Sequence, residues 1–300
     1  MKKSPLLSTV GVLVPLLFFC SLLYQCREAQ VYPEHPPKQV IVFADYLVNH
    51  PQKTLNMLNK QLIRPITDEI LVQEKKELRP FNISVYPVYC NTGAAVPLMN
   101  IQLRQQHIDR IRKTDYLGLE EAREHIITQV QKGWKNFTPD TDNERCRVLA
   151  SLPVLAQKLS AIASDDLSIV YLSDLVELNC PTRAMERRYC FLQPELNIVD
   201  GMSIQKAREN LKQPSSRLFK DCIEPFTKKI NPSDLDTIDL FLISSNLYTV
   251  LPDPRYEYDK AYLYSFWDEL FTQIGFTTKQ HDSIIDAKIF GNNPALSAGN

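Results

Sequence analysis

Short, almost continuous apolar runs recur along this chain. The runs VIVFAD, LSIVYL and IDLFLIS occupy residues 40–45, 167–172 and 238–244. Runs of this length with little polar alternation are typical of strands buried on both faces of a parallel sheet. A further segment, FNISVYPVYC at 81–90, alternates and contains Pro87, which predicts a strand near an edge of the same sheet.

Longer amphipathic segments separate these runs. In them apolar residues recur about every three to four positions, which is the spacing of one helical face. We predict that Gly275 ends the last helix. The predicted helices span 54–77, 102–132, 145–163, 204–212, 216–229 and 258–276.

The alternation of strands and helices predicts the fold class. It is typical of an α/β fold, here a three-layer sandwich with a mostly parallel, Rossmann-like central sheet. One domain over 39–290 accounts for all these elements. Residues 291–300 are small and polar, and we predict that they form a disordered tail.

The chain before this domain divides into three parts. Residues 1–4 carry Lys2 and Lys3, residues 5–25 carry no charge, and residues 26–38 contain three prolines. At about 1.5 Å per residue, the uncharged part can cross a hydrocarbon core of about 30 Å as a transmembrane anchor. A cleaved secretory signal is the alternative interpretation. In both cases the positive-inside rule predicts that the domain lies outside the cytoplasm, on a stiff proline-rich tether.

Composition and charge exclude several function classes. The formal net charge of -1 gives no electrostatic reason to expect a nucleic-acid partner. With 8 Gly against 20 Pro, the sequence has no glycine-rich phosphate-binding motif. The motifs G-x-S-x-G and H-E-x-x-H are also absent, so the sequence identifies no catalytic residue.

Two residue pairs leave their chemistry open. Cys180 and Cys190 bracket a short polar, basic loop, and they form either a disulfide after export or two free thiols. No C-x-x-C motif occurs, so neither a zinc ribbon nor a thioredoxin-like site is indicated. Glu121 and His125 are one helical turn apart, which suits a metal or acid–base pair, although we favour an ordinary solvated helix face.

Asp45 ends the first apolar run, and open α/β sheets bind ligands at the carboxyl ends of their strands. The segments VIVFADYLVN, NFTPDTDNERCRVLASL and SIVYLSDLVELN follow one another along the chain. In this order they resemble the metal-site segments of a divergent von Willebrand factor type A domain, over residues 39–276. In that family Asp-x-Ser-x-Ser, a loop threonine and Ser/Thr-Asp-Gly together hold a divalent cation, commonly magnesium, which binds a partner's carboxylate.

The resemblance implies a cation site made of Asp45, Asn49, Thr138 or Thr141, and Asp174. Magnesium prefers about six oxygens in near-octahedral geometry, several of them from water. Leu47 stands where the family has a serine, and Leu175 stands where it has a glycine. We therefore expect no resident cofactor, or only weakly bound magnesium at a vestigial site. Alternatively, Asp45 and Asp174 only cap the following helices and need no metal.

Together these features predict a membrane-anchored, extracytoplasmic interaction module of the adhesion or scaffold type. Its partner would be another protein of a multi-component envelope system. The alternative, from another class, is an exported metal-dependent hydrolase that uses Asp45 and Asp174. An enzyme needs a further general base or nucleophile in the same pocket, whereas a docking site needs an exposed, shallow face.

Overall fold

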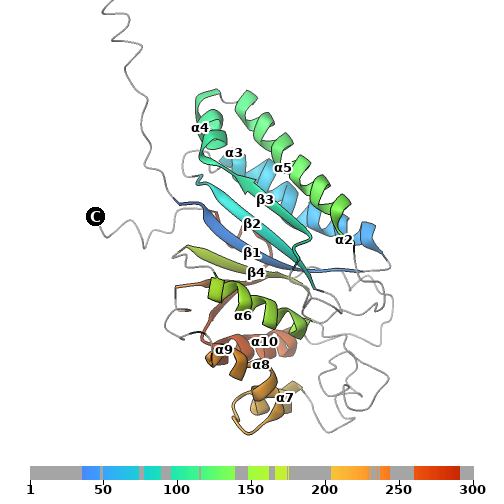
Figure 1. The fold of residues 1–300 in the computed structure, drawn as a ribbon, viewed down its shortest axis with the longest axis vertical. Coiled ribbons are helices and arrows are strands. Elements are labelled where there is room, and N and C mark those ends of the chain that lie inside the picture. Colours follow the sequence, from blue (N-terminus) through green and yellow to red (C-terminus); the bar gives the residue numbers. More distant parts are fainter. Residues whose placement is uncertain are drawn as a thin grey trace, which may run out of the picture. The chain divides into compact units, whose positions relative to one another are not determined.

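A mixed sheet of six strands forms the centre of the domain in the computed structural model (Figure 1). The strand order is β3-β2-β1-β4-β5-β6. All neighbouring pairs are parallel except β2 and β3. The strands are β1 (Lys38–Asp45), β2 (Phe81–Val88), β3 (Met99–Leu103), β4 (Leu167–Leu172), β5 (Asp239–Ile243) and β6 (Thr277–His281).

The structure describes residues 36–47, 50–73, 78–88, 96–114, 116–138, 148–161, 166–173, 175, 204–228, 230, 235, 237–243 and 260–290. The described residues, from 36 to 290, belong to one compact unit. The basic start, the uncharged segment 5–25, nearly all of the tether and the tail 291–300 lie outside the described residues. Within the described ranges, no helix combines the length and apolarity needed to cross a membrane.

The three apolar runs form adjacent parallel strands, as predicted. β1 pairs with β4, and β4 pairs with β5. β2 lies on the other side of β1 and is next to the edge, because β3 pairs with its residues 81–85. Pro87 has no amide hydrogen to donate, and it lies beyond the part of β2 that β3 covers.

The helices lie between the strands in the sequence, as predicted. Phe219 donates its amide hydrogen to the hydroxyl of Ser216, which caps α8. Gly275 ends α10 with a φ of 118°, and the amide of Phe276 bonds back to the carbonyl of Phe271. The helices are α2 (Pro51–Leu58), α3 (Leu71–Gln73), α4 (Gln105–Thr114), α5 (Tyr116–Asn136), α6 (Ser151–Ala161), α7 (Ile204–Leu211), α8 (Arg217–Cys222), α9 (Glu224–Thr227) and α10 (Lys260–Ile274).

One uninterrupted helical segment, 51–73, joins β1 to β2. Between α2 and α3 it widens into π-helical stretches at Asn59–Ile63 and Pro65–Ile70. Pro65 cannot donate an amide hydrogen within a helix, and the amide of Arg64 bonds to the carbonyl of Asn59, five residues back. The predicted helix 54–77 is therefore present, with a local widening beside an internal proline.

Helices cover both faces of the sheet. Tyr86, Phe43 and Tyr171 lie side by side in register on β2, β1 and β4, with ring centroids 5.8 and 5.0 Å apart. α10 packs on this row through Phe271, and α6 bonds to Tyr171 through the Ser151 hydroxyl at 2.9 Å. The opposite face carries Val42 and Val170, which are 0% and 1% exposed.

α5 packs closely on that opposite face. A Cβ added to Gly133 would lie 2.6 Å from the Cβ of Met99 on β3, so only glycine permits this approach. The side chain of Gln129 also accepts from the amide of Gln102 and donates to the carbonyl of Gln102, at 2.9 and 3.1 Å. These two bonds satisfy part of the outer edge of β3, which would otherwise be open to pairing with another strand.

Two parts of the sequence prediction were wrong. The predicted helix 102–132 begins as the edge strand β3, and its helical part consists of α4 and α5, with α5 continuing to Asn136. The other edge strand, β6, was not predicted at all. Its sequence, TTKQH, is polar and largely exposed, so it lacks the apolar pattern on which strand prediction relies.

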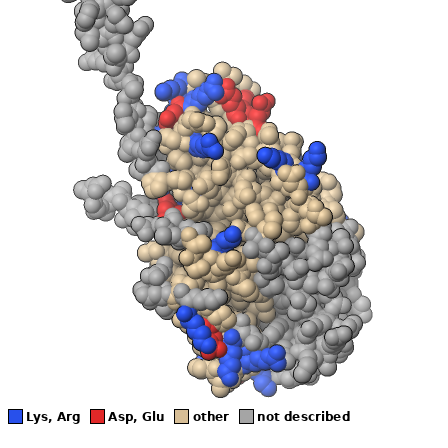
Figure 2. Space-filling view, in the orientation of Figure 1, with Lys and Arg blue, Asp and Glu red and all other residues tan. Residues whose placement is uncertain are grey.

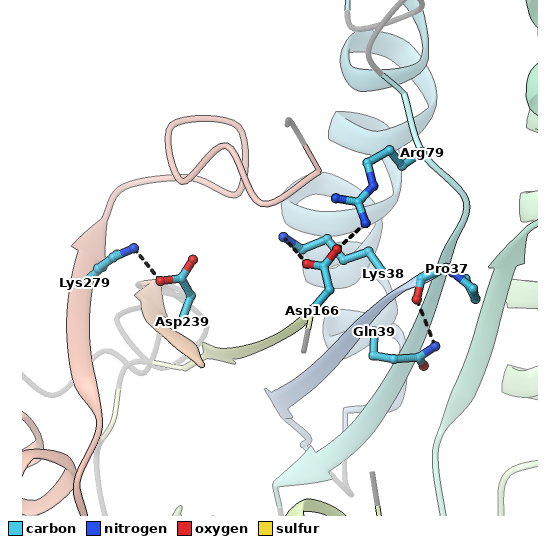
Figure 3. Close-up of polar contacts among 7 residues, drawn as sticks. All are labelled: Pro37, Lys38, Gln39, Arg79, Asp166, Asp239 and Lys279. Atoms are coloured by element: carbon cyan, nitrogen blue, oxygen red, sulfur yellow. Dashed lines mark hydrogen bonds and ion pairs between the residues drawn. The ribbon is translucent and has the colours of Figure 1, made fainter. Parts of the chain in front are cut away.

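Ion pairs fasten the amino edge, the edge of the sheet at which its parallel strands begin. Lys38, at the start of β1, is only 7% exposed and lies 3.5 Å from a carboxylate oxygen of Asp166. Arg79 pairs with the same carboxylate, so Asp166 lies between two cations (Figure 3). Lys279 of β6 pairs with Asp239 of β5 in the same way. The first two pairs join the starts of β1 and β4 to the segment leading into β2, and the Lys279–Asp239 pair joins β5 to β6.

Candidate functional site

The carboxyl edge of the sheet, where the parallel strands end, contains the position at which a ligand site is expected. β1 and β4 are neighbours, but the chain leaves β1 toward β2 and leaves β4 toward β5, in opposite directions across the sheet. Such a reversal is where open α/β sheets bind ligands. Asp45 is the last residue of β1 and therefore lies at this point.

The carboxylate of Asp45 is fully buried and hydrogen-bonded. Its side chain is 0% exposed, and its Oδ1 accepts the hydroxyl hydrogen of Ser173 at 2.6 Å. Ser173 follows β4, and its amide bonds to the carbonyl of Ile243 at the end of β5. The serine therefore ties three adjacent strand ends together through one side chain and one amide.

The Ser173 hydroxyl has a second bond, which shapes the turn after β4. It accepts the amide hydrogen of Leu175 at 2.8 Å, a local turn that serine side chains often form. Leu175 is fully buried and adopts a φ of 61°, the left-handed region that costs a non-glycine residue about 1–2 kcal/mol. This is the position at which the family resemblance implies glycine, so the backbone keeps a glycine-like conformation while the side chain fills the core.

α10 holds this turn from the other side. The indole Nε1 of Trp267 donates to the carbonyl oxygen of Leu175 at 2.8 Å, and Trp267 is itself 0% exposed. Asp45, Ser173, Leu175 and Trp267 thus form a continuous hydrogen-bonded chain from β1 through the β4 turn to α10. We call these four residues the buried chain. The three hydrogen bonds that join these residues are all made between groups of the protein.

The segment after β1 is fixed in a similar way. The amide of Leu47 donates to the hydroxyl of Thr54, a fully buried residue in α2, at 2.9 Å. Leu47 is half-buried and packs against the core. Its apolar side chain suits this contact, whereas the serine that the resemblance implies at this position would be polar. Tyr46 packs on Trp134 and Phe137 near the end of α5, with ring centroids 6.0 and 5.3 Å away.

The sequence-predicted site is partly within the described residues. Thr138 follows Phe137 and is exposed, so the Phe137–Tyr46 contact places the start of its loop near the carboxyl edge. No described contact joins Thr138 to Asp45. Asn49, Thr141 and Asp174 lie outside the described residues, as do Cys180 and Cys190.

Several oxygens around Asp45 are already hydrogen-bonded within the protein. Magnesium needs about six oxygens with open lone pairs. Here one Asp45 oxygen is bonded to Ser173, the Ser173 oxygen accepts from Leu175, and the Leu175 carbonyl accepts from Trp267. Among the residues that the structure describes, no group of three or more His, Cys, Asp or Glu side chains could hold a metal ion.

Glu121 and His125, the other candidate pair from the sequence, each contact a different residue of α4. Glu121 forms an ion pair with Arg110 of α4 at 2.8 Å. The ring of His125 stacks instead on His107 of α4, with centroids 4.3 Å apart, and the Nδ1 of His107 accepts the amide hydrogen of Arg104 at 3.2 Å. That bond requires an unprotonated Nδ1, so the stack, which joins α4 to α5, suits a neutral His107 ring.

Acidification should weaken the α4–α5 contact. The pKa of His107 is lowered from its ordinary value of 6.5, first by burial and then by the charges of His125 and Arg104, while Glu121 acts in the opposite direction. Because the folded state binds this proton less tightly, the histidine's contribution to stability is present above pH 6.5 and is lost as the pH falls toward the lowered pKa. Urea unfolding between about pH 7 and pH 5 should therefore show a smaller loss for His107→Gln than for wild type.

The control for this pH effect is His50→Gln, which changes an exposed histidine outside the stacked pair. It should keep the wild-type pH profile. Equal loss of stability on acidification in wild type and His107→Gln would contradict the assignment.

Sequence reasoning missed two members of the buried chain. Ser173 was expected only as part of a strand-end motif, and the bond from its hydroxyl to Asp45 joins residues 128 positions apart. Trp267 was expected only as part of an amphipathic helix. The one available signal was Trp267 itself, because a buried indole needs an acceptor for its N–H.

Comparison with models of known protein families finds no family that matches this chain, and comparison with curated proteins finds no match.

Proposed function

We propose that this protein is a membrane-anchored, extracytoplasmic interaction module with a von Willebrand factor A-like domain that docks a protein partner at its carboxyl edge. The uncharged segment 5–25, with lysines before it, supports the anchor and the orientation. The adjacency of β1 and β4 supports the family resemblance, because it brings together the two strand ends that the family uses for a common site.

One observation carries the proposal. The Asp45 carboxylate lies where the chain reverses direction across the sheet. It is fully buried and accepts a hydrogen bond from Ser173. An adhesive domain that has lost its cation can keep such a carboxylate to hold its strand ends in place. The rival hydrolase would need the Asp45 carboxylate at the reacting centre, and a group with 0% exposure is poorly placed for contact with substrate.

Docking would use the loops around the buried chain rather than Asp45 itself. The exposed Thr138 lies in one of these loops, beside the aromatic contact between Phe137 and Tyr46. Loops positioned by a rigid sheet commonly carry binding residues. The role of the buried chain is then to fix the turns from which these loops start.

Site-specific photo-cross-linking tests the docking edge. The full chain, carrying p-benzoylphenylalanine in place of Thr138, is expressed in its host, irradiated in intact membranes and analysed for protein adducts. The matched control replaces Thr277, another exposed threonine, which starts β6 at the opposite, amino edge. We expect a discrete protein adduct from position 138 that excess unmodified chain competes away.

Two outcomes would count against the docking edge. Equal adducts from positions 138 and 277 would mean that the contact is not specific to the carboxyl edge. Absence of any protein adduct at position 138 in membranes that contain the full chain would remove the proposed partner site.

A further inference from the structure

The amino edge of the sheet is where the chain enters the domain. β1 starts at Lys38, directly after the proline-rich segment, and the uncharged residues 5–25 precede that segment. If those residues anchor the chain, as proposed above, a tether of residues 26–38 links the bilayer to this edge. Thirteen extended residues reach at most about 45 Å, which limits how far this edge can lie from the bilayer.

The helices that flank β3 place a second feature at this same end. β3 runs antiparallel to β2, so its last residue, Leu103, lies opposite Phe81 at the amino edge, and α4 starts there. α5 then returns toward the carboxyl edge, where Trp134 meets Tyr46. The turn between α4 and α5 therefore lies on the amino side, next to α4 in Figure 1.

The helical segment 51–73 ends on the same side. It leaves β1 at the carboxyl edge and delivers the chain toward the start of β2, so it runs opposite to α5. The two are neighbours, because the Nε of Arg123 donates to the carbonyl of Thr67 at 2.9 Å. Val72, near the end of this segment, and Tyr116, at the start of α5, therefore lie toward the same end of the helix pair.

Exposed apolar side chains collect at this end. Among the described residues, five large apolar side chains are exposed, and three of them are Val72, Tyr116 and Leu117, at 46%, 73% and 60%. We call these three the apolar tip. Lys113 is exposed in the last turn of α4, and Figure 2 shows Lys and Arg side chains gathered at the end of the view where Figure 1 places α4, with acids beside them.

We infer that the apolar tip is a membrane-contact surface that rests in the headgroup region of the bilayer. Tyrosine has an apolar ring and a polar hydroxyl, which suits the membrane interface, and leucine and valine gain by leaving water there. Lys113 can lay its stem along the lipid and reach a phosphate. Anchor and tip together would give the chain two points of attachment to the bilayer.

Photo-cross-linking to lipid tests this inference, which depends on the proposed function only for the anchor. The full chain with p-benzoylphenylalanine in place of Tyr116 is reconstituted into vesicles of phosphatidylethanolamine and alkyne-tagged phosphatidylglycerol, then irradiated. We expect a tagged lipid adduct at position 116. The matched control is the same substitution at Ile127, an exposed residue farther along α5, which should give little adduct.

A second variant tests whether Leu117 contributes to the lipid contact. Leu117→Asp places a charge on an exposed position, so folding should be unaffected, yet the lipid adduct at position 116 should fall several-fold. An unchanged yield in Leu117→Asp, equal yields at 116 and 127, or adducts to protein instead of lipid would each overturn the lipid assignment. Resistance to alkaline extraction reports the anchor separately, so a failed anchor and a failed tip give different results.

Discussion

Replacing Val42 by Asp should unfold the domain. Val42 is 0% exposed in the middle of β1, with β2 on one side and β4 on the other. The new carboxylate would have no cation or hydrogen-bond donor in this apolar layer, and burying it would cost several kcal/mol. That cost approaches the whole free energy of unfolding of a typical domain, about 5–15 kcal/mol. Loss of the cooperative transition in thermal or urea unfolding measures the effect.

A matched control for this substitution is Val96→Asp. Val96 is 60% exposed in the segment before β3, so the same chemical change there stays in water. Its unfolding midpoint should remain close to that of wild type. A soluble Val42→Asp variant with a cooperative transition near the wild-type midpoint would contradict the assignment of β1 to the centre of the sheet.

The sequence predicted the central strands because burial on both faces requires an almost continuous apolar run. VIVFA and LSIVYL are apolar at nearly every position, and every residue from Val40 to Asp45 and from Leu167 to Leu172 is buried. Edge strands have a weaker apolar pattern in the sequence. β3 has the sequence MNIQL, with alternating burial over only five residues, and β6 is polar with no buried residue.

Only the features of the site that depend on one strand alone could be predicted from the sequence. That Asp45 ends β1 follows from the apolar run alone. Its partner depends on which strand lies beside β1 and in which register, and neither property is local in sequence. The left-handed turn at Leu175 was also hidden, because the glycine that usually marks such a turn is absent. Hydrogen bonds between Leu175 and the side chains of Ser173 and Trp267 hold the backbone instead.

The buried chain gives Asp45 a structural role that survives without a cation. Its carboxylate is the acceptor that orients Ser173, and Ser173 in turn holds the amide of Leu175. Removing the acceptor in Asp45→Ala would leave the hydroxyl hydrogen of Ser173 without its carboxylate partner, at a cost of about 1.5–3 kcal/mol, the range for a hydrogen bond to a charged group. Asp45→Asn keeps an oxygen in the same place and should cost less.

Removal of magnesium should hardly change the stability of this domain. A ligand that binds only the folded state stabilises it by RT ln(1 + [L]/Kd). For a millimolar site at millimolar magnesium this is less than about 0.5 kcal/mol, whereas an intact micromolar site would contribute about 4 kcal/mol. We expect the weak value, because the Leu47 side chain offers no oxygen, and because Asp45 Oδ1, the Ser173 hydroxyl and the Leu175 carbonyl already have protein partners. Urea unfolding in magnesium and in EDTA measures the difference.

Asp45→Ala separates the structural role from the metal role. If the carboxylate serves only the buried chain, this variant loses the same amount of stability in magnesium and in EDTA. If it ligates magnesium, the loss is larger in magnesium by the binding contribution, and calorimetric titration of wild type shows micromolar binding that the variant lacks. That second result would revive the cation-dependent site and, with it, a partner that docks through its own carboxylate. An equal loss in both buffers would leave Asp45 as the internal acceptor that keeps β1, β4 and α10 in place beneath the docking loops.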